Sequence, residues 1–292
     1  APRKILIDAD PGGDDAVALM LALMYEAKTH DIEILAIGVS YGNTYLENAS
    51  MNMLKILTVA DKNKLVYVGA KKPLINKYVF DNFFGDDGFG DFNFTQEITA
   101  KIDRSKHASV AYVDLVKKYP DQITIITLGP LTTIAMAIAL EPNFLSLTKQ
   151  HIIMGASLKT NEIEFNFQQD PESDWIALNN VDKPNIIVPI DTVYSHIFSQ
   201  VIYHNIYKSI HIEKQLVNIA KRKKGSRKSV SSISDKIFSK SQLHVMYLLI
   251  IISFNYNEQY NLLSGNQTGG AVATNGVSRP KCSLPLPNTA LM

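Results

Sequence analysis

Residues 5–15 have the sequence Ile-Leu-Ile-Asp-Ala-Asp-Pro-Gly-Gly-Asp-Asp. Residues 4–7, which are apolar after Lys4, predict a strand that is buried on both faces. Pro11, Gly12 and Gly13 predict a tight turn, because proline fixes its own backbone angle and glycine adopts angles that other residues avoid. The apolar residues 16–24 predict a buried helix directly after the turn. The stretch therefore indicates the strand, turn and helix that begin an α/β fold.

Four carboxylates lie within eight residues of this stretch, at Asp8, Asp10, Asp14 and Asp15. Like charges this close raise each other's pKa unless a positive charge lies among them. A divalent cation that prefers oxygen ligands would supply that charge, and Asp is one of its usual ligands. Acids also favour the positive end of a helix, but capping a helix needs one or two of them rather than four. The pattern predicts a metal site at the carboxyl end of the first strand, where open α/β sheets bind ligands.

Composition excludes several other classes of protein. The chain has 292 residues, 46% of them hydrophobic and 20% charged, which suits one large domain. A net charge of +1 argues against a nucleic-acid binder, and the basic run at 221–228 is interpreted as a solvated helix end or loop. Cys282 is the only cysteine, so disulfides within the chain are excluded. The sequence contains no run of about 18 apolar residues, so it predicts no membrane span.

The cellular location stays open between secretion and the cytoplasm. The chain begins at Ala1 rather than Met, which is compatible with a removed leader. Three tripeptides, beginning at Asn48, Asn93 and Asn266, match the glycosylation acceptor pattern. Such tripeptides are common by chance, so they favour secretion only weakly.

Apolar strands alternate with helical patterns after the first unit. Strands are predicted at residues 33–39, 66–68, 123–128, 151–154 and 185–189. Helices are predicted at residues 47–60, 107–118, 131–140 and 170–179, and a polar, aromatic and glycine-rich loop at 76–94. The last helix would begin with Asp170 as its N-cap and Pro171 at its first position. This alternation predicts an open, mostly parallel sheet flanked by helices.

The chain resembles the inosine-uridine nucleoside hydrolase family, which are calcium-dependent N-ribohydrolases. Five motifs in the family's order, spread over about residues 4 to 200, carry the resemblance. They are Asp-x-Asp-Pro-Gly-x-Asp-Asp at 8–15, Gly-Asn at 42–43, Gly-Pro-Leu-Thr at 129–132, Met-Gly at 154–155, and Glu-Phe-Asn at 164–166 followed by Asp-Pro-Glu at 170–172. The resemblance implies a nucleoside hydrolase-like fold, a small-molecule nucleoside as substrate, and a homodimer or homotetramer.

The resemblance also implies a calcium site and a catalytic base. Asp10, Asp15 and the backbone carbonyl of Leu128 would bind Ca²⁺, and a main-chain ligand places no demand on its side chain. Asp10 would also accept the proton of the attacking water, whose pKa the ion lowers.

The remaining matching residues would bind the ribose of the substrate. Cleavage of the N-glycosidic bond passes through an oxocarbenium-like state, so oxygen atoms around the sugar would stabilise the developing positive charge. By resemblance, Asp14 and Asn166 hold the secondary hydroxyls and Asn161 and Glu164 the 5′-hydroxyl. Asn43 would lie near the sugar and the attacking water, and the side chain of Met154 would line the pocket.

The loop at 81–90 would lie on the side of the nucleobase. Its glycines are compatible with a mobile lid whose phenylalanines stack on the base, or with a surface loop held by buried aromatic side chains. Some members of the family carry a His there that helps the base to leave. This chain has no His between Gly69 and Lys106, so the sequence leaves purine or pyrimidine preference open.

The C-terminal part departs from the family pattern. The family supplies a further calcium ligand from an Asp near its C-terminal end. After Asp235 this chain contains no Asp, and Glu258 is its only acid. Residues 264–292 show no period of a strand or helix, so we expect residues 1–263 to form the hydrolase-like domain and 264–292 an atypical, disordered tail.

Three functions follow from these observations. The first is a calcium-dependent ribonucleoside hydrolase, in which Glu258, Asn261 or water replaces the lost ligand. The second is a catalytically impaired homologue that binds a nucleoside or ribose and lacks the complete ion site. The third, a phosphotransfer enzyme with an aspartyl nucleophile, is disfavoured because residues 11–15 offer neither the Thr nor the Lys that it needs.

Overall fold

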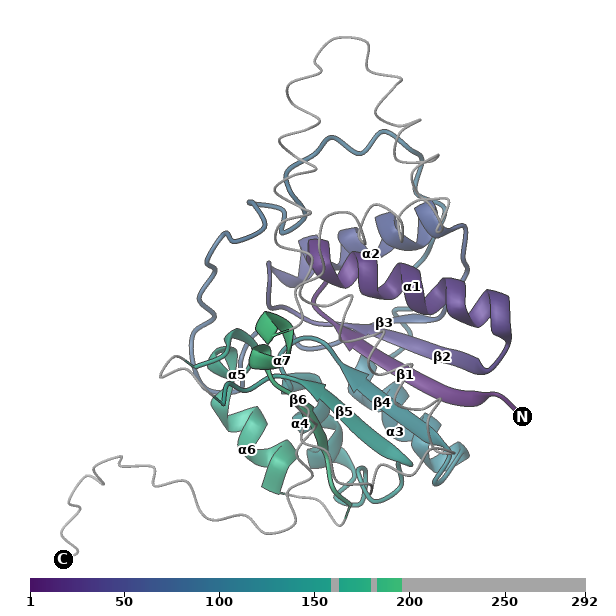
Figure 1. Cartoon of the computed structure of the whole chain (residues 1–292), viewed down its shortest axis with the longest axis vertical. Helices are drawn as coiled ribbons and strands as arrows, with labels where there is room; N and C mark the ends of the chain where they lie inside the picture. Colours follow the sequence, from purple (N-terminus) through teal and green to yellow (C-terminus); the bar gives the residue numbers. More distant parts are fainter. Residues whose placement is uncertain (159–162, 180–182, 196–292) are drawn as a thin grey trace, which may run out of the picture.

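The computed structural model describes residues 1–158, 163–179 and 183–195 (Figure 1). These residues form a six-stranded sheet in the order β3-β2-β1-β4-β5-β6, and every neighbouring pair of strands is parallel. The strands are β1 (Arg3–Ala9), β2 (Ile32–Val39), β3 (Val66–Val68), β4 (Ile123–Thr127), β5 (Gln150–Met154) and β6 (Ile186–Val188). The predicted open parallel sheet is therefore confirmed.

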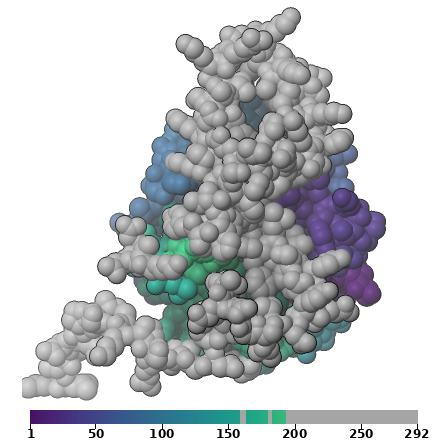
Figure 2. Space-filling view, viewed as in Figure 1, coloured from purple at the N-terminus to yellow at the C-terminus, as the bar shows by residue number. Residues whose placement is uncertain are grey.

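Helices cover both faces of the sheet (Figure 1). The described helices are α1 (Gly13–Thr29), α2 (Leu46–Ala60), α3 (Ala108–Lys118), α4 (Thr132–Leu140), α5 (Phe165–Gln169), α6 (Pro171–Asn179) and α7 (Ile190–Ser195). One apolar cluster joins the sheet to α1 and α2, and a second joins it to α3, α4 and α6. In the space-filling view, the purple surface of the N-terminal residues lies at the right and the green surface of residues 163–179 and 183–195 lies left of centre (Figure 2). None of the described helices is long and apolar enough to cross a membrane.

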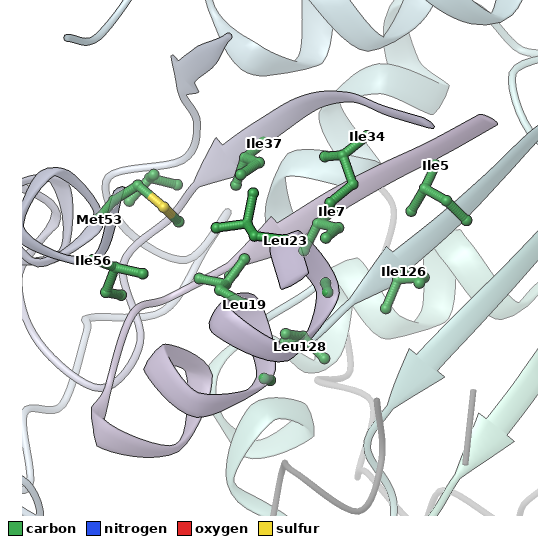
Figure 3. Packing of buried hydrophobic residues seen from close by; sticks show 14 of the residues in the cluster. Ile5, Ile7, Leu19, Leu23, Ile34, Ile37, Met53, Ile56, Ile126 and Leu128 are labelled. Atoms are coloured by element: carbon green, nitrogen blue, oxygen red, sulfur yellow. The ribbon is translucent and has the colours of Figure 1, made fainter. Parts of the chain in front are cut away.

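β1 is one of the two central strands and is buried on both faces, as its sequence predicts. Ile5 and Ile7 point toward α1 and α2, where they pack with Leu19, Leu23 and Met53 (Figure 3). Leu6 points to the opposite face and joins the cluster of α3 and α4. Because successive side chains of a strand alternate between its faces, an apolar run can serve both layers.

The loops after β1, β2, β4 and β5 meet at one edge of the sheet. Ser40 N–H donates to the carbonyl of Ala9 at 2.9 Å, and Leu128 N–H donates to the carbonyl of Asp8 at 2.8 Å. These bonds bring the turn after β2 and the turn after β4 to either side of the acidic turn after β1. The strand order reverses between β1 and β4, which is the switch point at which open α/β sheets bind their ligands.

Two short helices, α5 and α7, are not predicted by the sequence pattern. They contain five and six residues, which is too short for an apolar period of 3.6 to be recognised. α6 begins at Pro171 as predicted, and Asp170 caps it by accepting Ser173 N–H at 3.2 Å.

Candidate active site

Asn43, which follows β2, holds the two carboxylates that the family resemblance assigns to calcium. Its backbone N–H donates to Asp10 Oδ2 at 2.7 Å. Its side-chain Nδ2 donates to the backbone carbonyl of Asp10 at 3.0 Å and to Asp15 Oδ2 at 3.2 Å. Gly12 N–H adds a second bond to Asp15 Oδ2 at 3.1 Å. The predicted residues Asp10, Asp15 and Asn43 therefore form one buried, hydrogen-bonded unit.

Two glycines make room for the Asp10 carboxylate. A Cβ atom on Gly42 would lie 2.0 Å from Asp10 Oδ2, and one on Gly129 would lie 2.6 Å from Asp10 Oδ1. Both distances are far below a van der Waals contact, so a larger residue at either position would displace the carboxylate. The glycines of the Gly-Asn and Gly-Pro-Leu-Thr motifs, which follow the two strands beside β1, thus leave space for the same carboxylate.

The electrostatics of Asp10 indicate a lack of positive charge. Burial raises the pKa of Asp10 well above its usual value, and the charges of Asp15 and Asp14 raise it further, while the Asn43 N–H opposes the rise. Asp10 Oδ1 is buried and has no hydrogen-bond partner among the described residues. Asp10 also takes no part in the ion pairs found in this part of the chain.

Asp8 has a different environment from the other three carboxylates. It is fully buried, and the Tyr112 hydroxyl of α3 donates to its Oδ2 at 2.8 Å. Burial raises the pKa of Asp8 to about 7, against the opposing effect of the Tyr112 hydrogen bond. The charges that raise the pKa of Asp10 come instead from Asp15 and Asp14. Of the four carboxylates in the sequence motif, Asp10, Asp14 and Asp15 thus form the interacting group.

Asn166 of α5 connects the ends of β4 and β5. Its Nδ2 faces the carbonyl of Leu128 at 2.7 Å, the carbonyl of Met154 at 3.3 Å and Met154 Sδ at 3.0 Å. Three acceptors around one nitrogen define the orientation of this amide. Glu164 caps α5, since its Oε2 accepts Phe167 N–H at 3.1 Å. The structure thus brings Leu128, Met154 and Asn166 together, with Glu164 two residues before Asn166 in the chain.

Some of the other residues predicted from the sequence lie within the described part of the chain, and some lie outside it. Asp14 lies in the first turn of α1, where its Oδ1 accepts Asp15 N–H at 2.9 Å. Asn161 lies outside the described residues, and so do the basic run at 221–228, Glu258, Asn261 and the predicted tail. Within the described residues, no group of three or more His, Cys, Asp or Glu side chains is arranged to hold a metal ion.

Sequence reasoning missed a polar network beside the site. Asp170, predicted only as a helix cap, also accepts the Thr132 hydroxyl at 2.6 Å and Leu74 N–H at 3.0 Å through its Oδ2. The Thr132 and Tyr41 hydroxyls lie 3.0 Å apart. The presence of Thr132 in the Gly-Pro-Leu-Thr motif and of Asp170 in the Asp-Pro-Glu motif was the signal in the sequence that could have indicated this network.

A parallel sheet with buried carboxylates after its first strand, held by an Asn that follows the next strand, is typical of α/β proteins that bind a polar ligand at the switch point. The model of the inosine-uridine preferring nucleoside hydrolase family matches residues 5–273, and the chain belongs to this family.

Known relatives agree with this assignment. The chain is 36% identical over 185 residues to an inosine-uridine preferring nucleoside hydrolase of Leishmania major, a match that covers 61% of this chain and 57% of that protein. It is 32% identical over 176 residues to the pyrimidine-specific ribonucleoside hydrolase RihB of Escherichia coli, covering 59% of this chain and 54% of that protein. The matched segment thus spans little more than half the length of these relatives.

Solved structures share the fold. An inosine-guanosine nucleoside hydrolase superposes with a TM-score of 0.67 at 25% identity, covering 87% of this chain and 79% of that chain. A plant nucleoside hydrolase superposes with the same TM-score at 22% identity, covering 87% of this chain and 80% of that chain.

Proposed function

We propose that this chain hydrolyses the N-glycosidic bond of ribonucleosides and releases the free base and ribose. The observation that supports this function most is the buried pair of carboxylates, Asp10 and Asp15, held by Asn43 at the switch point of the sheet. The relatives described above are named for inosine-uridine and for pyrimidine nucleosides. Inosine and uridine are therefore the substrates to test first.

The residues around Asp10 fit a calcium ion. Asp10 Oδ1 is buried without a hydrogen-bond partner in the described part of the chain, and the pKa of Asp10 is raised by burial and by Asp15. Both features favour a bound cation. Asp10, Asp15 and the Leu128 carbonyl would hold it, and the carbonyl has a lone pair left after accepting Asn166. Ca²⁺ bound there would lower the pKa of a water molecule.

Asp10 is the residue that we assign as the general base. The Asn43 N–H holds this carboxylate through Oδ2, and the carboxylate would take the proton of the attacking water. The unit formed by Asn43, Asp10 and Asp15 fixes the direction in which Oδ1 points.

Asp14, Asn166, Glu164 and Met154 would surround the ribose. As positive charge develops on the sugar, the Asp14 and Glu164 carboxylates would stabilise it. The Nδ2 of Asn166 is engaged by Leu128 and Met154, so its Oδ1 is the atom available to accept a ribose hydroxyl. Asn161 would add a contact to the 5′-hydroxyl, as the family resemblance implies.

A second candidate function is supported by the C-terminal sequence. Residues 236–292 contain no Asp, whereas the family resemblance implies a further calcium ligand from an Asp in the C-terminal part. Loss of an anionic ligand weakens calcium binding, because the charge of a site is a main determinant of its affinity. A protein that binds a nucleoside without hydrolysing it would result.

One assay separates the two candidates. Release of base and of reducing sugar from inosine and uridine is measured with added Ca²⁺ and after treatment with a calcium chelator. We expect hydrolysis that chelation abolishes and Ca²⁺ restores. Calorimetric binding of either nucleoside without any release of base would identify the impaired homologue, and neither binding nor release would refute both functions.

A further inference from the structure

One peptide group in the site is hydrogen-bonded at both of its ends. The carbonyl of Gly42 accepts the Tyr78 hydroxyl at 2.7 Å. The N–H of Asn43, which belongs to the same peptide group, donates to Asp10 Oδ2, also at 2.7 Å. Tyr78 is therefore connected to the Asp10 carboxylate through a single planar amide.

Hydrogen bonds in such a chain strengthen one another. A donor at the carbonyl oxygen polarises the amide, which makes its N–H a stronger donor to the carboxylate. Asp10 and Asn43 are buried and Tyr78 is half-buried, so the screening by water that would weaken this effect is reduced. The Asn43 N–H is also the contact that opposes the rise in the pKa of Asp10.

Tyr78 is held in place by more than its hydroxyl. Its ring makes edge contacts with Tyr41, at 5.1 Å between ring centroids, and with Tyr45, at 5.2 Å. Gln169 Nε2 donates to the carbonyl of Val79, the residue after Tyr78, at 3.3 Å. The hydroxyl stays protonated, because burial, and to a smaller extent the charge of Asp10, raise its pKa above the usual value. Tyr78 is thus a fixed and permanent donor.

We propose that Tyr78 is a positioning residue for Asp10 and that it acts through the Gly42–Asn43 peptide group. Its hydroxyl orients that peptide group, and the peptide group fixes and stabilises the Asp10 carboxylate from the Oδ2 side. The sequence pattern gave Tyr78 no role, because it lies in the long loop after β3 and is distant from every motif along the chain. The kinetic consequence of this proposal rests on the proposed hydrolase function, whereas its structural consequence does not.

The test compares Tyr78→Phe with Tyr45→Phe. Tyr78→Phe keeps the ring and removes only the hydroxyl, so the packing with Tyr41 is retained. Tyr45→Phe is the matched control, because it removes a hydroxyl from the adjoining ring, whose side chain is 52% exposed. Urea unfolding of both variants checks that the fold is intact.

The first readout is the amide proton of Asn43, observed by NMR in protein labelled with ¹⁵N at asparagine. We expect Tyr78→Phe to move this resonance upfield and to speed its exchange with solvent, and Tyr45→Phe to change neither. An unchanged Asn43 amide in Tyr78→Phe, or an equal change in both variants, would overturn the proposal. This readout is independent of catalysis, so it remains decisive if the wild-type chain proves inactive and the proposed function fails.

The second readout is the division between kcat and KM. We expect Tyr78→Phe to lower kcat about three- to tenfold, the range for one lost hydrogen bond, with KM for the nucleoside unchanged. Ca²⁺ affinity should fall in the same variant and stay constant in Tyr45→Phe. If the wild type is active and Tyr78→Phe matches it in kcat and in Ca²⁺ affinity, the hydroxyl does not position Asp10.

Discussion

Asn52 of α2 connects the acidic turn to the loop after β3, and its replacement should destabilise both. Its side chain is fully buried. Nδ2 donates to the carbonyl of Pro11 at 3.1 Å and to the carbonyl of Asp87 at 2.8 Å, while Oδ1 accepts Lys55 Nζ at 3.3 Å. Asn52→Ala removes these bonds and leaves the Pro11 carbonyl without its side-chain donor in a buried turn.

The expected loss of stability follows from these contacts. Two lost backbone contacts, at roughly 1 to 1.5 kcal/mol each, give a decrease of about 2 to 3 kcal/mol in the free energy of unfolding. With a urea m-value of about 3 kcal/mol per M, the midpoint of unfolding should fall by about 1 M at constant m.

The matched control is Asn48→Ala, one turn earlier on α2. Asn48 also contacts the loop, through the carbonyl of Asp86 at 3.2 Å, but it is partly exposed. Water can replace its hydrogen bond, so its midpoint should fall by no more than about 0.2 M, as for a surface substitution. Equal midpoints for the two variants, or an unchanged midpoint for Asn52→Ala, would refute the argument that Asn52 couples the turn to the loop.

Three further predictions test the site and its surroundings. Gly129→Ala should lower the Ca²⁺ affinity measured by calorimetry at least about tenfold, because the added Cβ would displace Asp10 Oδ1. A tenfold loss corresponds to about 1.4 kcal/mol of binding free energy. An unchanged affinity would contradict the proposal that Oδ1 binds the ion. Asp174→Asn should stabilise the protein increasingly as pH rises from 5 to 8.5. Burial first, and then the charges of Asp170 and Glu164, raise the pKa of Asp174 to about 9, so the wild-type fold retains a proton that the unfolded chain loses above about pH 4, and its stability falls with rising pH. Parallel pH profiles of urea unfolding for variant and wild type would refute this. Asp10→Asn should abolish hydrolysis and change the free energy of unfolding by no more than about 1 kcal/mol, because the amide keeps an acceptor for the Asn43 N–H. Unchanged release of base would remove Asp10 as the general base.

Much of the fold follows from residue pattern alone. Mostly apolar runs such as residues 4–7 are long enough to be recognised as strands. The predicted ends of α2, α3, α4 and α6 agree with the structure to within one residue, whereas α1 begins three residues before and ends five residues after the predicted range 16–24. α5 and α7 are the exceptions, since each contains too few residues for a periodic pattern. The Asp170-Pro171 pair marked the start of α6 because the chemistry of a helix cap is local in sequence.

The site was less predictable, because its contacts join residues far apart in the chain. The motif placed Asp10, Asp14 and Asp15 in one turn, and their roles stay predictions. The separate environment of Asp8 depends on Tyr112, 104 residues away. Likewise, no local signal connects Tyr78 to Gly42 or Asn52 to Asp87.

The loop at 81–90 shows the same limit of sequence reasoning. Its pattern allowed both a mobile lid and an anchored surface loop. In the structure Phe84 is buried, Phe83 is 43% exposed, and Asn52 and Lys55 contact Asp87. The loop as described has the contacts of the anchored alternative.

The central claim is that the acidic turn after β1 holds a divalent cation. Calorimetric titration of Ca²⁺ into the chelator-treated protein, beside Asp10→Asn and Asp15→Asn, tests it most directly. The account predicts saturable binding of one ion by the wild type and a loss of at least about tenfold in affinity in each variant, since each removes one anionic ligand. No binding by the wild type, or equal binding by all three proteins, would contradict it.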